Sequence, residues 1–178
     1  MSTRRAEFVT LDDLVDEVGV DAVRFFFLSR KSDSHLEFDL ELARKRSTDN
    51  PVYYVQYAHA RIANLCREAE RQGVAVPSGA FASDALAALD HPDDFELIGQ
   101  TAGYGEIVDL AARELEPHRV VFYLQDLAAT LHRYYNKHRI LGDEAPGRVQ
   151  ARLALLTVVQ RVLAAGLGLL GVSAPERM

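Results

Sequence analysis

The chain has 178 residues, of which 48% are hydrophobic and 26% are charged, and its formal net charge is −6. This composition is typical of a soluble globular protein with a substantial core. It includes no run of about 18 apolar residues and no secretory signal, so we expect no membrane span. The single cysteine, Cys66, excludes an internal disulfide framework and fits a reducing cytoplasm. The acidic balance argues against indiscriminate nucleic-acid binding.

The N-terminal part predicts short helices separated by polar turns. Thr10 and Asp21 are residue types that cap helix N-termini, and Gly19 is typical of a helix end. Leu36–Asp39 alternates apolar and polar residues like a short extended piece. The helices expected here are Leu11–Val18, Ala22–Leu28 and Leu40–Ser47.

The stretch Asn50–Arg61 reads NPVYYVQYAHAR and opens a helix that we expect to reach Arg71. Asn50 can cap this helix, and proline suits its first turn. At about 100° per residue the helix has two opposite faces. One carries Val52, Val55, Ile62 and Cys66, and the other carries Tyr53, Tyr57, Arg61 and Asn64, with Tyr54 at the flank. The second face either packs against another helix or offers planes on which unstacked bases lie. The residues alone leave both interpretations open.

The remaining chain predicts more helices and no paired strands. After a linker at Gln72–Gly79, the expected helices are Ser83–Leu89, Asp93–Ala102, Glu106–Leu115, Pro117–Lys137 and Arg148–Leu170. The last is apolar around most of its circumference and should be central. Within it, Gly166 and Gly168 either permit close helix approach or begin its unwinding. The expected fold class is an all-α helical bundle.

No constellation of catalytic or metal-binding residues is evident. His132 and His138 lack metal-ligand spacing, and there is no phosphate-binding glycine loop. His59 lies on the apolar face of its helix, where a core histidine is the simpler interpretation. We expect no metal and no cofactor in this chain, which looks like a binding module. The segment His132–Arg139 carries Arg133, Lys137 and Arg139 without an acid, which predicts a local basic surface.

Several segments resemble, in the right order, the region after the catalytic domain of bacterial arginyl-tRNA synthetases. These are Gly19–Leu28, with Asp-Ala-Val-Arg for the family's Asp-Ala-Leu-Arg signature, Phe38–Ser47, Asn50–Arg61, Ala111–Leu127, His132–Leu141 and Val159–Met178. The resemblance implies a stem-contact helical segment over residues 1–48 and a class I synthetase anticodon-binding bundle over residues 49–178. It weakens over residues 73–103.

The N-terminus is similar to the class I signature loop, Lys-Met-Ser-Lys-Ser, joined midway. Ser2, Thr3, Arg4 and Arg5 form this remnant, and a guanidinium there could supply charge toward a triphosphate. The family's nucleotide-binding fold lies upstream of such a loop. The resemblance therefore implies a fragment of arginine–tRNA ligase, with ATP and magnesium used by the full-length enzyme. We expect this chain alone to make no adenylate.

The resemblance also implies the partner and the contact residues. The partner is tRNA(Arg), chiefly its anticodon loop, bound by a monomer with the catalytic domain in cis or in trans. Residues carried over from the family are Tyr54, Tyr57, Arg61, Tyr135, Asn136 and Met178, and the basic surface adds Arg133, Lys137 and Arg139. Tyr53 and His59 are expected to be structural, and Arg24 to hold an ion pair within the fold. On its helix Tyr135 lies near the centre of the apolar face, so core packing competes with base contact. The alternative function is a free-standing helical module that binds RNA or protein without a synthetase role.

Overall fold

The computed structural model describes residues 10–31, 33–35, 37–77, 87–142 and 145–178. Within these ranges the chain forms α-helices and no strands, which confirms the all-α fold class. The signature-loop residues Ser2, Thr3, Arg4 and Arg5 lie outside the described residues, as does most of the helix predicted at Ser83–Leu89. The helices are α1 (Leu11–Val18), α2 (Val20–Leu28), α3 (Leu40–Arg44), α4 (Pro51–Arg71), α6 (Pro92–Ala102), α7 (Tyr104–Glu114), α8 (His118–Lys137) and α9 (Pro146–Leu169).

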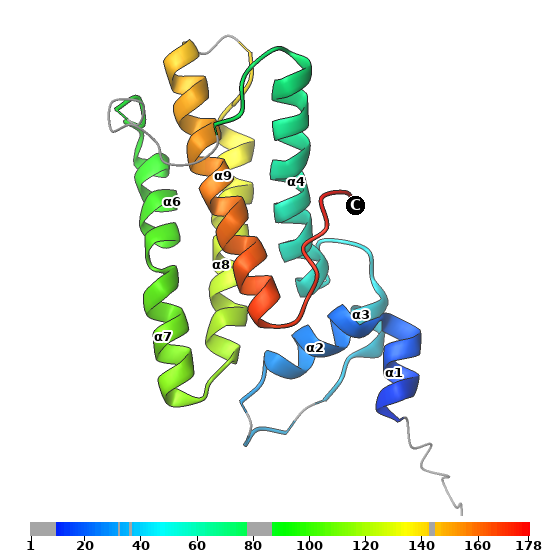
Figure 1. The fold of residues 1–178 in the computed structure, drawn as a ribbon. Coiled ribbons are helices and arrows are strands. Elements are labelled where there is room, and N and C mark those ends of the chain that lie inside the picture. The colour runs from blue at the N-terminus through cyan, green and yellow to red at the C-terminus, as the bar shows by residue number, and fades with distance from the viewer. Residues whose placement is uncertain (1–9, 32, 36, 78–86, 143–144) are drawn as a thin grey trace, which may run out of the picture.

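The long helices form a bundle with a small group of helices at one end (Figure 1). Helices α4, α8 and α9 pack against one another, and α6 and α7 follow each other along the opposite side of α8. The short α1, α2 and α3 contact one another below the bundle, where α2 also packs on α4 and α8. The largest fully buried side chains include Phe25, Ile62, Leu97, Leu124, Leu131, Tyr134, Leu156 and Leu163.

The junction between α3 and α4 depends on Asn50. Its side-chain oxygen accepts from the Val52 amide at 3.2 Å and caps α4. Its Nδ2 donates to the carbonyls of Ala43 at 3.0 Å and Lys45 at 2.9 Å. Because these bonds satisfy carbonyls at the end of α3, that helix ends at Arg44 and not at Ser47 as predicted.

Helix α9 is the central helix, as its apolar sequence predicted. Residues Gly147–Leu169 are long and apolar enough to cross a membrane by length and composition alone. In the bundle, Leu153, Leu156, Leu163 and Leu167 of this helix are fully buried, and α9 contacts α4, α6 and α8. This packing is the ordinary reason for a core helix to be so apolar.

The two glycines late in α9 have different roles. A Cβ built at Gly166 would lie 2.6 Å from Cδ2 of the buried Leu124, so this glycine permits the close approach of α8 and α9. A Cβ at Gly168 would meet nothing within 4 Å, and the helix continues to Leu169. Close approach, one of the two predicted alternatives, therefore applies to Gly166 alone.

Candidate nucleic-acid interface

The second face of α4 meets the C-terminal part of α8, and Arg61 lies at the centre of that contact. The Arg61 guanidinium carbon is 3.8 Å from the centroid of the Tyr135 ring. Its two terminal nitrogens donate to Nδ1 of His132 and to Oδ1 of Asn136, each at 3.3 Å. Three contacts therefore hold one guanidinium in place, so little side-chain entropy remains to be lost when it binds a ligand.

His132 lies beneath this arrangement, although its place in the sequence was interpreted only in terms of metal binding. Its ring is 9% exposed and lies 5.5 Å from the Tyr57 ring in a stacked geometry and 4.7 Å from the Tyr54 ring. Burial lowers the pKa of His132, and the Arg61 charge acts in the same direction. The neutral imidazole can accept from Arg61 through Nδ1. The spacing i, i+3, i+4 from His132 to Tyr135 and Asn136 was the signal that could have identified it.

A groove runs along α4 from these residues toward the C-terminus of the chain. Its cavity measures about 850 Å³ and is lined by Tyr57, Arg61, Asn64, Arg67, Arg71, Glu70, Glu176, Arg177, Met178 and Ala60. We call this cavity the α4 groove. Tyr57, Arg61 and Met178 were predicted site residues. Arg67 and Arg71 were missed, although both continue the i, i+3, i+4 series that runs from Tyr57 through Asn64.

A second cavity of about 500 Å³ lies on the side of α4 where α8 ends. Tyr135, Asn136, Lys137 and Arg139 border it, together with Asn64, which also lines the α4 groove. Tyr135 is half-buried beside the core, whereas its neighbour Tyr134 is 1% exposed and donates to Asp94 at 2.6 Å. Tyr135 therefore packs beside the core and also lies beneath Arg61, and its contact with a base stays a prediction.

The predicted basic surface is not one continuous patch. Arg133 pairs with Glu96 at 2.9 Å, and Lys137 pairs with Asp93 at 3.2 Å, so both cations are directed toward α6. Arg139 donates from Nε to the Leu141 carbonyl at 3.1 Å. The geometry places Arg133 apart from the two cavities. The predicted residues that line a cavity are Tyr57, Arg61, Tyr135, Asn136, Lys137, Arg139 and Met178.

Two further residues named from the sequence, Tyr54 and Arg24, lie outside the two cavities. Tyr54 is half-buried against the core and does not line either cavity, and burial raises its pKa. Arg24 enters no ion pair among the described residues, and its side chain instead lies against Gly171, where a Cβ would be 2.5 Å from Nη1. The predicted ion pair is therefore wrong. His59 is 5% exposed and bonded to the Pro175 carbonyl at 2.9 Å, as expected of a core histidine.

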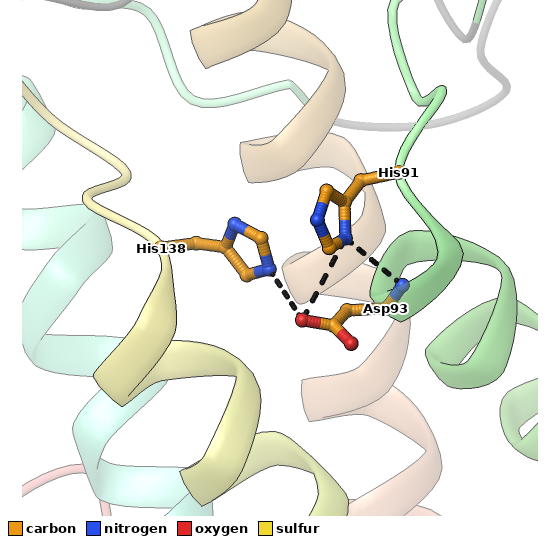
Figure 2. Close-up of side chains that lie close together, drawn as sticks. All are labelled: His91, Asp93 and His138. Atoms are coloured by element: carbon orange, nitrogen blue, oxygen red, sulfur yellow. Dashed lines mark hydrogen bonds and ion pairs between the residues drawn. The ribbon is translucent and has the colours of Figure 1, made fainter.

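His91, Asp93 and His138 form the one group among the described residues with the spacing of a metal site (Figure 2). Their ligand atoms lie within 4.8 Å of one another, but each already has a partner. Nδ1 of His91 accepts from the Asp93 amide at 3.1 Å. Nδ1 of His138 faces the Arg152 guanidinium at 3.3 Å, so its Nε2 carries the proton donated to Asp93 at 2.8 Å. Metal-bound histidines instead donate from their second nitrogen, so this cluster is better suited to joining α6 to α8 than to holding a metal.

The fold and the groove together define an all-α helical module whose groove is lined by aromatic and cationic side chains. Over its whole length the chain is 58% identical to the arginine–tRNA ligase of Syntrophotalea carbinolica and 53% identical to that of Citrifermentans bemidjiense. It spans 32% of the length of each of these relatives. Its fold matches 99% of the chain to 29% of the arginyl-tRNA synthetase of Thermus thermophilus, with a TM-score of 0.73 and 30% identity.

The family model of the DALR anticodon binding domain matches residues 55–178. The chain belongs to this family. The match includes the α4 groove, the C-terminal part of α8 and the C-terminal tail, so the cavities described above lie inside the domain that gives the family its name.

Proposed function

We propose that the chain is the tRNA-binding part of an arginine–tRNA ligase and binds the anticodon loop of tRNA(Arg) in the cytoplasm. The observation that carries this proposal is the Arg61–Tyr135 pair, held by His132 and Asn136 between two cavities. Arginylation, with its use of ATP and magnesium, belongs to a protein about three times as long, such as the relatives above. We assign this chain no step of that reaction.

Unstacked bases would lie beside Tyr57, whose ring also stacks with Tyr53 and His132, and beside the Arg61–Tyr135 pair. Each stacked base contributes about 1–3 kcal/mol and shows little sequence preference. The phosphates between the bases would meet Arg67, Arg71 and Arg177, which line the α4 groove. They would take the place of the Glu176 and Glu68 carboxylates that pair with Arg67 and Arg71. The resulting affinity should fall as salt is raised, because each neutralised phosphate releases counterions.

Reading one base requires hydrogen bonds in addition to stacking. We propose that the second anticodon base, a cytosine in arginine tRNAs, enters the α4 groove beside Met178. The candidate partners are Arg61 and main-chain groups of the tail, which line this groove, and Asn136, which accepts a hydrogen bond from Arg61. Filter binding should show weaker affinity for a tRNA in which this base is exchanged. Equal affinity for both tRNAs would rule out base reading by this chain.

A matched pair of α4 substitutions separates RNA contact from folding. Tyr57→Ala should weaken tRNA binding by about 5- to 100-fold through the lost stack. Val55→Ala removes a fully buried side chain and should instead destabilise the fold by about 1–3 kcal/mol. If Tyr57→Ala left tRNA affinity unchanged, the alternative of a helical interaction module without RNA binding would be favoured.

A further inference from the structure

The C-terminal tail after α9 lies along α4 and ends at the α4 groove (Figure 1). Three polar side chains of α4 each donate a hydrogen bond to a main-chain carbonyl of the tail. The bonds run from Gln56 to Ser173 at 3.0 Å, from His59 to Pro175 at 2.9 Å and from Arg67 to Glu176 at 2.9 Å. The tail therefore has a fixed path from Ser173 to Glu176.

The start of this path is bound by α2, which does not line the α4 groove. Asp21, in the first turn of α2, accepts from the Ser173 amide at 3.1 Å and from Nε2 of Gln56 at 2.9 Å. The Ser173 hydroxyl also donates to Asp21. One carboxylate thus joins α2, α4 and the tail, and Gln56 at this junction is 8% exposed.

A second residue of α2 contacts the tail one helical turn further on. Arg24 lies against Gly171, whose φ of +67° and missing Cβ leave room for the guanidinium. Asp21 and Arg24 share one face of α2 because they are three residues apart. The two charged residues of the Asp-Ala-Val-Arg sequence therefore both contact the beginning of the tail.

We infer that Asp21 is a positioning residue for RNA binding, which acts by fixing the tail that places Arg177 and Met178 in the α4 groove. This inference rests on the proposed function. Asp21 touches no groove residue except through the tail and α4. Without its carboxylate, the Ser173 amide and hydroxyl lose their acceptor, and the bonds from Gln56 to the Ser173 carbonyl and hydroxyl remain.

The inference predicts the behaviour of Asp21→Asn in the 178-residue chain. Backbone amides of residues 172–178 should exchange hydrogen faster, while those of α8 and α9 should keep their rates. Affinity for a tRNA(Arg) transcript should fall about tenfold, the size expected for a lost hydrogen bond to a charged group. Asp16→Asn, on the exposed part of α1, is the matched control and should change neither measurement.

A double-mutant cycle distinguishes tail positioning from a general structural effect. In a chain ending at Glu176, which lacks Arg177 and Met178, Asp21→Asn should cause no further loss of tRNA affinity. The same loss in both backgrounds would overturn the inference. If Asp21→Asn unfolds the chain, Ser173→Ala provides the second variant, since it removes one donor from the junction and leaves α2 unchanged.

Failure of the proposed function would be visible separately. In that case the unmodified chain would not bind the transcript, whereas the exchange rates of residues 172–178 would still respond to Asp21→Asn if the carboxylate holds the tail. Unchanged tail exchange rates in Asp21→Asn would overturn the positioning role, whatever the chain binds.

Discussion

The C-terminal part of α8 has cations on two sides, one facing α4 and one facing α6. The cations on the two sides have different partners. On the side facing α4, Arg61 lies on the Tyr135 ring and next to His132, with a cavity on either side. On the side facing α6, Arg133 and Lys137 are paired with Glu96 and Asp93. Arg61 contacts only uncharged groups in these bonds, so its charge stays available to a ligand, whereas the charges of Arg133 and Lys137 are each matched by a carboxylate.

Two adjacent tyrosines test this difference most strongly. Tyr134→Phe removes the hydroxyl that donates to the fully buried Asp94 at 2.6 Å. Leaving a buried acceptor short of a partner costs about 1–3 kcal/mol, so the free energy of unfolding should fall by that amount. Tyr135→Phe keeps the ring beneath Arg61 and should change stability by less than about 0.5 kcal/mol. Urea unfolding of both variants makes the measurement, and equal losses would contradict the assignment of the two sides.

A smaller effect should appear in the pH dependence of the α6 side. The hydrogen bond from His138, with that from Lys137, holds the pKa of Asp93 below its ordinary value. A lowered folded-state pKa gives stability that is present above the unfolded-state pKa of about 3.9 and is lost as pH falls through the folded value. Asp93→Asn should therefore be less stable than the parent chain at pH 7, and this difference should shrink below about pH 4.

The control for this comparison is Asp109→Asn, because Asp109 pairs with Arg113 of its own helix. Such an exposed pair contributes about 0–1 kcal/mol, so its removal should have a minor effect at either pH. Urea unfolding at pH 7 and pH 3 measures both variants. If Asp93→Asn lowered the free energy of unfolding by the same amount at both pH values, the carboxylate charge would not be the cause of the lost stability.

Local signals predicted the helices well because their causes are local. Thr10 caps α1 with a reciprocal bond to Asp13, and Asn50 with Pro51 begins α4. The residue types at both helix starts had indicated this. The end of α3 was predicted three residues too late, because the acceptors that Asn50 satisfies lie in a different helix. The sequence predicted three residues, 103–105, between α6 and α7. In the structure Gly103 alone separates the two helices, because α7 already begins at Tyr104.

The candidate site was predictable where it lies on one helix face and not where it depends on pairing between helices. Helical spacing identified Tyr57 and Arg61 on α4, and extending the same series would have added Arg67 and Arg71. Nothing local to Arg133 or Lys137 indicates their partners, which are 37 and 44 residues away in the sequence. The contact of Arg24 with Gly171 is equally non-local, so nothing near Arg24 in the sequence indicated it.

Affinity for a tRNA(Arg) transcript, measured at two salt concentrations for Arg61→Gln and Arg133→Gln, tests the central claim most directly. Each change removes one positive charge from the same region, but only Arg61 lies in the α4 groove. Arg61→Gln should weaken binding about tenfold or more and reduce the salt slope by about one, whereas Arg133→Gln should stay within about twofold of the parent chain. Equal losses in the two variants, or a larger loss in Arg133→Gln, would contradict the assignment of RNA binding to the α4 side.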